Sequence, residues 1–253
     1  MISDFASALG LTSRAFLTLV GIAFAAGLVR GFTGFALSAL VMASAALILP
    51  PVELIPMLWF MEIAASVLMV KGGWAEADRR IALGLVVGSA VGVPIGLALT
   101  VTIDPHSSRL VALCLLVSLA LLQLGKVRIA GLATTPGLYL SGVTAGIATG
   151  LAGIGGMVVA LYVLAQDKPA RVMRASLVLF LFGGSLVSLV THLAYGTMDT
   201  QAAARGVAFA LPTVLGVILG MAAFTPRFER WYKPICLVLL IGLSLAGIIR
   251  LVV

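Results

Sequence analysis

The stretch Ala-Gly-Leu-Val-Arg-Gly-Phe-Thr-Gly at residues 26–34 returns in modified form as Ala-Gly-Ile-Ala-Thr-Gly-Leu-Ala-Gly at residues 145–153. The spacing of 119 residues also relates Pro50 to Pro169. A pattern shared over this distance indicates that the chain contains two copies of one unit. We therefore predict a first repeat at residues 1–126 and a second repeat at 127–253, together forming one domain.

The composition predicts that this domain lies in a membrane. Of the 253 residues, 62% are hydrophobic and 10% are charged, whereas soluble domains are roughly 45–50% apolar and about 25% charged. Several apolar runs approach the roughly 20 residues that a helix needs to cross a bilayer. The run at 110–122 lacks the alternating polarity of a barrel strand. The expected fold is therefore an all-α integral membrane protein.

Each half is expected to contribute three full spans and one helix pair that is broken at glycine and resembles a re-entrant hairpin. This arrangement predicts about 8–10 membrane segments in total, because a broken pair counts as one or two of them. The expected full spans are 51–70, 81–102, 110–124, 175–195, 202–224 and 235–253. The expected broken pairs are 11–29 with 35–49, and 137–149 with 154–165.

Basic residues predict how the two halves are oriented. In the first half they follow the third segment, at Lys71, Arg79 and Arg80, whereas the corresponding connection of the second half is poor in them. The connection after the fourth segment shows the opposite bias, because it is rich in basic residues in the second half and poor in them in the first. Cytoplasmic loops of membrane proteins are enriched in Lys and Arg. One topology satisfies both contrasts, with the two halves inverted and both termini outside. The same rule accounts for the net charge of +7 without an anionic macromolecule as partner.

The two glycine clusters are candidates for backbone that leaves the helix within the membrane. Such backbone survives where it lines a cavity, and the helix ends at such breaks present free N–H groups to anions. We therefore predict that both clusters face each other and form a substrate site. The alternative is that these glycines only permit close helix packing. The candidate substrate-binding residues are Arg30, Gly31, Thr33, Gly34, Ser38, Thr149, Gly150, Gly153, Gly155, Gly156 and Ser185.

Three ionisable residues interrupt apolar runs. Arg30 precedes Gly31, and its planar guanidinium suits an oxyanion, although it could instead extend toward the cytoplasmic surface. Glu62 lies about twelve residues into its run and should face a partner or a cavity. It could carry a coupling proton or form an ion pair with Arg30. His192 is a second candidate for proton coupling, and a hydrogen-bonded histidine at a helix end is the alternative.

Other functional classes find no support in the sequence. Cys114 and Cys236 lie in apolar runs without metal-ligand spacing. No nucleophile motif, phosphate-binding loop, metal-spaced cluster or nucleic-acid module appears. We therefore expect no enzyme activity, catalytic residue, cofactor or metal, and no nucleic-acid partner. Trp74, Trp231 and Tyr232 flank spans and are interpreted as anchors at the membrane surface.

The residues described above resemble the sulfite exporter TauE/SafE family, also called the toluene sulfonate uptake permease family. The resemblance rests on the stretch 27–35, the Pro50-Pro51 pair, the Glu62 region, and the second glycine block at 146–156 with its following Pro169. It covers essentially the whole chain. One departure is Ala36, where the family usually has glycine, followed by Leu37. This departure narrows the expected first-half site.

The resemblance implies a multi-pass carrier of the bacterial inner membrane that moves sulfite, sulfoacetate, sulfonates or other small organic anions. Together with the predicted inverted repeats, it suggests a secondary transporter that works by alternating access, with protons as a candidate coupling ion. Two alternatives stay open at this point. One is a passive anion channel, and the other is a non-transporting membrane subunit of a larger complex. The particular anion, the direction of transport and the oligomeric state do not follow from the sequence.

Overall fold

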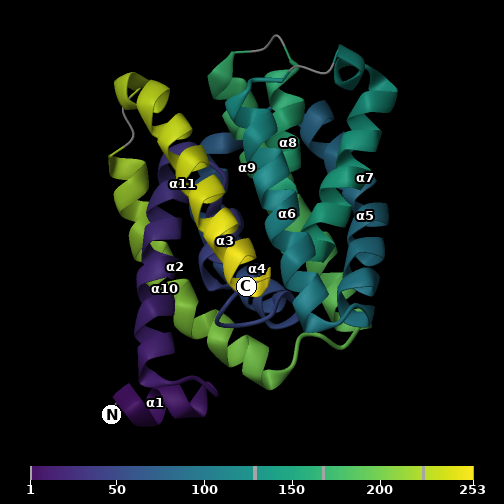
Figure 1. Ribbon diagram of the computed structural model, residues 1–253. Coiled ribbons are helices and arrows are strands. Elements are labelled where there is room, and N and C mark those ends of the chain that lie inside the picture. The colour runs from purple at the N-terminus through teal and green to yellow at the C-terminus, as the bar shows by residue number, and fades with distance from the viewer. Residues whose placement is uncertain (1, 128–129, 167–168, 224–225, 253) are drawn as a thin grey trace.

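The regular elements of the protein are all helices in the residues that the computed structural model describes, which are 2–127, 130–166, 169–223 and 226–252 (Figure 1). This confirms the predicted all-α fold. The elements are α1 (Ile2–Ala8), α2 (Ser13–Thr33), α3 (Leu37–Ala45), α4 (Pro51–Gly73), α5 (Arg79–Thr102), α6 (Pro105–Leu124), the short 3-10 helix η1 (Ala130–Ala133), α7 (Thr135–Ala152), α8 (Gly155–Leu164), α9 (Ala170–Ala194), α10 (Thr200–Ala222) and α11 (Pro226–Val252).

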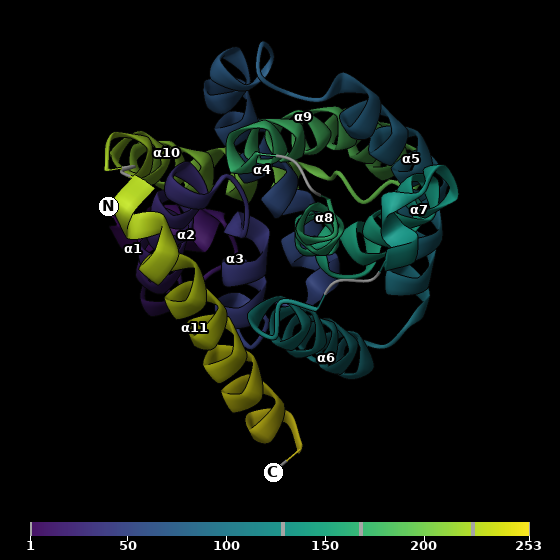
Figure 2. The same ribbon diagram turned by 90° about the horizontal axis from the view of Figure 1, so that it is seen from above.

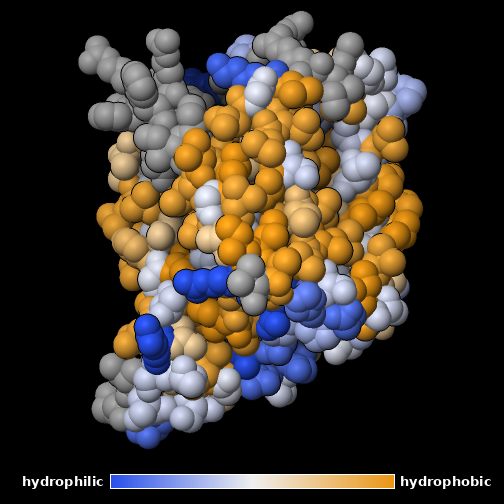
Figure 3. Space-filling model, in the orientation of Figure 1, coloured by the Kyte–Doolittle hydropathy of each residue, from blue (hydrophilic) through white to orange (hydrophobic). Residues whose placement is uncertain are grey.

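Six of the described helices are long and apolar enough to cross a membrane: α2, α4, α5, α6, α9 and α10. Large apolar side chains cover the outside of these helices, and Leu83 and Val190, for example, are more than half exposed. Figure 3 shows the resulting hydrophobic band, with hydrophilic residues toward its lower and upper ends. Lipid tails are as apolar as these side chains, so exposing them there carries no penalty. The protein is therefore a multi-pass membrane protein.

In both broken pairs, the first helix ends later along the chain than predicted. Gly31, Thr33 and Gly150 were expected in the irregular backbone, but all three lie within α2 or α7. These helices end only at Gly34 and Gly153, which adopt the left-handed φ values of 85° and 70° that glycine tolerates best. Consequently α2 is long enough for a full span, and α7 is 18 residues long.

The helical glycines instead bring long helices together. A Cβ atom added at Gly31 would overlap the Val217 carbonyl oxygen of α10, and one at Gly150 would overlap the Leu97 backbone nitrogen of α5. Gly92 of α5 meets the Val143 carbonyl oxygen of α7 in the same way. The pairs α2 with α10 and α5 with α7 are consequently the most extensive helix contacts of the described chain.

The two short helices α3 and α8 lie inside the ring of longer helices, as the view from above shows (Figure 2). Helix α3 contacts α4, α6 and α11, while α8 contacts α6 and α9. Eight of the nine residues of α3 are at most 5% exposed, and Ala39, Met42 and Ala45 are among them. Both helix breaks are therefore held in the protein interior, where irregular backbone is tolerated in a membrane protein.

Candidate functional site

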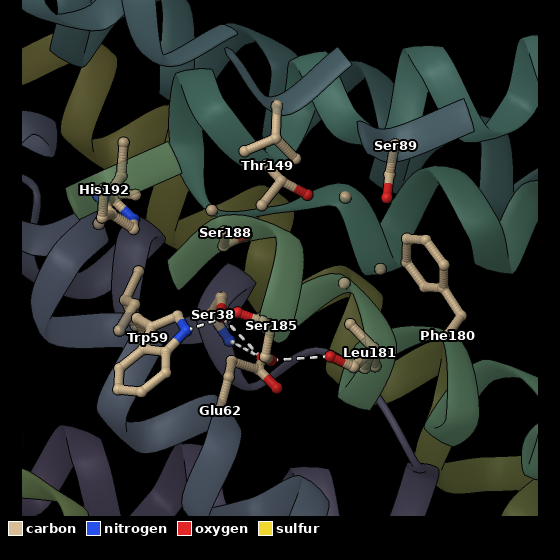
Figure 4. Close-up of a pocket in the computed structure, with 17 residues that line it drawn as sticks. Ser38, Trp59, Glu62, Ser89, Thr149, Phe180, Leu181, Ser185, Ser188 and His192 are labelled. Atoms are coloured by element: carbon tan, nitrogen blue, oxygen red, sulfur yellow. Dashed lines mark hydrogen bonds between the residues drawn. The ribbon is translucent and has the colours of Figure 1, made fainter. Parts of the chain in front are cut away.

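A cavity of about 60 Å³ lies where the two helix breaks approach α4 and α9 (Figure 4). Its wall includes Ser38 at the start of α3, Glu62 of α4, Thr149 of α7 and Ser185 of α9. A water molecule needs about 10–15 Å³ of such space, so the cavity has room for several waters or for a small solute. It is the candidate functional site.

The two helix breaks adjoin each other at this cavity. A Cβ atom added at Gly153 would lie 3.7 Å from the Cβ atom of Ser38. A second, smaller cavity of about 10 Å³ is lined by both breaks, with Ala36 on one side and Ile154 on the other. Ala36 has a left-handed φ of 73°, which is uncommon for a residue with a Cβ atom. The break at Gly153 thus lies against the start of α3, while Gly34, the last glycine of the first cluster, packs against Arg174.

Glu62 presents its carboxylate to the start of α3. Its Oε1 atom accepts hydrogen bonds from the Ser38 hydroxyl at 2.7 Å and from the Ser38 backbone N–H at 3.3 Å. The side chain is 15% exposed and lines the cavity. A carboxylate at this depth needs charged or hydrogen-bonding partners, and these contacts supply two of them.

Arg30 stands behind Glu62 and does not line the cavity. Its side chain is completely buried, and its Nε atom lies 3.5 Å from the Glu62 Oε2 atom. Its other nitrogens donate hydrogen bonds to the Gly34 carbonyl oxygen and, at 3.0 Å, to the Ser66 hydroxyl. The geometry thus corresponds to the ion pair with Arg30 that was considered for Glu62. The two terminal nitrogens of Arg30 donate within the protein, its Nε atom faces the Glu62 carboxylate, and the side chain holds the end of α2 against α4.

Eight predicted site residues come together at the cavity: Ser38, Glu62, Thr149, Gly153, Gly155, Gly156, Ser185 and His192. Five others do not line it, namely Arg30, Gly31, Thr33, Gly34 and Gly150. The Thr33 hydroxyl donates to the Val29 carbonyl oxygen at 2.9 Å, while Gly31 and Gly150 pack against neighbouring helices. Close packing, the alternative considered for the glycines, therefore accounts for these two positions.

Several cavity residues were not singled out from the sequence. Trp59 donates its indole N–H to the Ser185 carbonyl oxygen at 2.7 Å and so joins α4 to α9 across the cavity wall. Phe180 and Ser188 of α9 and Ser89 of α5 also line it. The only sequence signal for Ser188 is helical spacing: it lies three positions after Ser185, and residues at this spacing share one helix face.

His192 lies at one end of the cavity and is only 2% exposed. Its Nδ1 atom lies 2.7 Å from the hydroxyl of Thr197. Thr197 in turn lines a separate polar cavity of about 170 Å³, together with Glu53 and Arg205. Arg205 is ion-paired with Glu53 and donates from Nε to the Leu9 carbonyl oxygen at 2.8 Å. The His192 contact therefore separates the central cavity from this second one.

Other predicted features are partly within the described residues. Trp74 is half exposed at the end of α4, as expected of a surface anchor, and the Arg79 guanidinium lies 5.6 Å from its ring centroid. The side chains of Trp231, Tyr232 and Cys236 lie outside the described residues. Within the part that is described, no group of three or more His, Cys, Asp or Glu side chains could hold a metal ion.

The sequence was compared with protein families, and residues 19–247 match the family described as Sulfite exporter TauE/SafE. The match covers nearly the whole chain. The chain belongs to the sulfite exporter TauE/SafE family. Comparison with curated proteins and with solved structures gave no match.

Membership of the TauE/SafE family confirms the resemblance predicted from the duplicated glycine stretches. The family name and the apolar helices agree on a membrane transporter. In a TauE/SafE protein, a buried cavity bordered by two broken helices is the natural place to look for the transported solute. The bacterial inner membrane is the usual location of such proteins.

Proposed function

We propose that this TauE/SafE protein is a secondary transporter of sulfite or another small sulfur-containing anion, and that the central cavity is its substrate site. The observation that carries the proposal is the position of the cavity where both helix breaks meet. Helix α8 begins at this cavity with no side-chain cap at Ile154, and the first N–H groups of a helix lack partners within the helix. They favour a negatively charged group.

The lining of the cavity fits a small anion with an apolar portion. Hydroxyl groups of Thr149, Ser185 and Ser188 provide polar contacts, while Trp59 and Phe180 provide aromatic walls. A cavity of mixed lining with few polar groups is typical of sites that orient a small solute. This combination of hydroxyl groups and aromatic walls suits a sulfonate as well as sulfite, so both belong to the proposed class of substrates.

The proposal of alternating access rests on the relation between the two halves. Helices α2–α6 correspond in order to α7–α11, and their contacts exchange: α2 packs on α10 and α7 packs on α5, while α4 packs on α9 and α6 on α11. In Figure 1, α2 runs upward from the end that carries α1, whereas α7 runs downward. These features support two inverted repeats, residues 1–126 and 127–253, that rock about the cavity between them.

Glu62 is the proposed proton-coupling group. It lines the cavity, and its Oε2 atom has no hydrogen-bond partner among the described residues. The charged or titratable groups nearest to it are Arg30 of α2, which faces it from behind, and His192 of α9, which lines the same cavity. A proton that binds at Glu62 would change the charge that a substrate anion meets. In this way it would couple proton movement to anion transport.

Purified protein in sealed vesicles tests the proposal. We expect labelled sulfite or methanesulfonate to accumulate inside against its own gradient when a pH gradient is imposed. A passive channel would only equalise the concentrations, and a non-transporting subunit would leave them at the level of empty vesicles. Either of these results would contradict the proposed carrier.

A variant that fills the cavity shows whether the anion passes through it. Gly184 lines the cavity, and an added Cβ atom there would meet only the Phe180 ring, at 3.9 Å. We expect Gly184→Leu to reduce transport to the background of empty vesicles. Gly242→Leu is the matched control, because Gly242 is exposed on α11 with no atom within 4 Å of an added Cβ. Normal transport by Gly184→Leu would place the route elsewhere.

A further inference from the structure

The two half-helices α3 and α8 begin alike but differ in what faces their first turn. Both lack a side-chain cap, at Ala36 and Ile154 respectively. At α3, the Glu62 carboxylate accepts hydrogen bonds from the backbone N–H and the hydroxyl of Ser38, the second residue of the helix. A carboxylate at this position accepts hydrogen bonds from the first turn and is favoured by the helix dipole, as a bound anion would be.

The corresponding position in the second half is Leu181, which lies 119 residues after Glu62. Leu181 lies against the start of α8, since a Cβ atom added at Gly156 would be 3.3 Å from its Cδ2 atom. A methyl group cannot accept a hydrogen bond. The backbone N–H groups of Gly155 and Gly156 accordingly have no partner among the described residues.

Two buried polar side chains reach the same cavity as Gly155 and Gly156. Ser188 is 5% exposed, and its hydroxyl has no hydrogen-bond partner among the described residues. His192 is 2% exposed, and the contact of its Nδ1 atom with Thr197 leaves the Nε2 atom unpaired in the described structure. Both side chains border the cavity, so their unpaired polar atoms are available to a ligand at its α8 end.

We propose that the ionised Glu62 carboxylate is a built-in anion that occupies the N-terminus of α3, so that only the N-terminus of α8 receives the transported anion. The α8 assignment rests on the function proposed above and makes it more specific, because it assigns one anion to each half-helix N-terminus. Arg30 is the counter-ion of Glu62, at 3.5 Å between Nε and Oε2. The pair as a whole is neutral, and the incoming anion therefore does not face an uncompensated negative charge.

The α3 part of the proposal is tested without transport, by restoring the missing carboxylate. Glu62→Ala leaves a space beside Ser38 and Arg30 that formate can enter. We expect millimolar formate to raise the thermal unfolding temperature of Glu62→Ala in a concentration-dependent way. Wild-type protein and Glu62→Gln, in which the space is filled, should show no such rise. The same is expected of Glu76→Ala, because Glu76 lies at the surface in an ion pair with the exposed Arg171.

Two results would overturn the α3 assignment. One is a Glu62→Ala protein that formate does not stabilise, and the other is an equal effect of formate on wild-type protein. Both results are read from the unfolding temperature, without a transport measurement.

The α8 part is tested by giving the second half a carboxylate of its own. Leu181→Glu can cap α8 as Glu62 caps α3, whereas Leu181→Gln has the same size and no charge. We expect sulfite binding to Leu181→Glu to weaken at least about tenfold, because like charges in one site cost more than 1.4 kcal/mol. Binding to Leu181→Gln should stay within about threefold of wild type, since hydrogen bonds to neutral groups contribute little net energy.

Each result of this binding experiment has a distinct meaning. Equal sulfite affinity of Leu181→Glu and Leu181→Gln would overturn the α8 assignment while the proposed transport function stands. Failure of wild-type protein to bind either sulfite or methanesulfonate would overturn the proposed function, and with it the α8 assignment. If Leu181→Glu does not fold, Gly156→Val replaces it, since its added methyl groups reach the same first turn and should also weaken sulfite binding. Unchanged binding by Gly156→Val would then overturn the assignment.

Discussion

The Nε atom of Arg30 lies 3.5 Å from the Oε2 atom of Glu62 in the interior of the helix bundle. Arg30 is completely buried and also donates hydrogen bonds to Gly34 and Ser66. The pair therefore connects α2 and its break to α4, which carries both Glu62 and Ser66. A buried pair of this kind is costly to break, because the remaining charge loses its compensation.

Replacing the arginine tests this structural role. We expect Arg30→Gln to lower the free energy of unfolding by roughly 3–5 kcal/mol, because Glu62 would be left as an uncompensated buried charge. Thermal unfolding in detergent measures the change. Arg14→Gln on the exposed start of α2 is the control and should have little effect. The double variant Arg30→Gln with Glu62→Gln should be more stable than Arg30→Gln alone, and a less stable double variant would contradict the pairing.

Replacing the glutamate tests proton coupling. We expect Glu62→Gln to keep sulfite transport down a concentration gradient but to lose the part that an imposed pH gradient adds, because glutamine does not titrate. External pH is held constant so that the ionisation of sulfite does not change, and only the internal pH of the vesicles is varied. Glu76→Gln at the surface should respond like wild type. A full response to the pH gradient in Glu62→Gln would remove Glu62 from the coupling mechanism.

Alanine substitutions of two glycines in α2 test whether Gly31 serves helix packing. Gly31→Ala should destabilise the protein by about 1–3 kcal/mol, because its methyl group would overlap the Val217 carbonyl oxygen of α10. Gly21→Ala on the same helix has no atom within 4 Å of the added Cβ, so it should be neutral or stabilise by up to about 1 kcal/mol. Chemical or thermal unfolding of both variants provides the measurement. Equal stability of the two would contradict the packing role of Gly31.

Ser188 tests the polar lining of the cavity. Removing one hydrogen bond to a bound anion costs about 1.5–3 kcal/mol, so Ser188→Ala should weaken sulfite binding roughly tenfold or more. Ser118→Ala is the matched control, because the exposed Ser118 hydroxyl donates to the Cys114 carbonyl oxygen within α6. Titration of sulfite into each purified variant measures the affinity. Unchanged affinity of Ser188→Ala would exclude its hydroxyl from the site.

Some features of the site could be predicted because their signals are local. Apolar runs of the right length predicted five of the six candidate spans of the described chain, and these helices begin or end within a few residues of the prediction. The sixth is α2, which was expected as half of a broken pair, whereas the expected span 235–253 is not among the six. The glycine stretches predicted the breaks because Gly34 and Gly153 must adopt positive φ values. Glu62 could be selected because a carboxylate within an apolar run has few stable environments, all of them involving a partner or a cavity.

Other features depend on how each helix is rotated toward its neighbours, which a sequence pattern does not specify. The sequence placed Gly31, Gly34 and Arg30 side by side as site candidates, yet none of them lines the cavity. Trp59 and Ser188 do line it, although neither differs in sequence from an ordinary residue of a membrane helix. The sequence by itself thus determined a duplicated, helical membrane protein with two breaks, because hydropathy and backbone freedom are properties of short segments. Only the tertiary structure decided that Arg30 lies beside Glu62 and that Leu181 lies against the start of α8, because these relations depend on distances between side chains of separate helices.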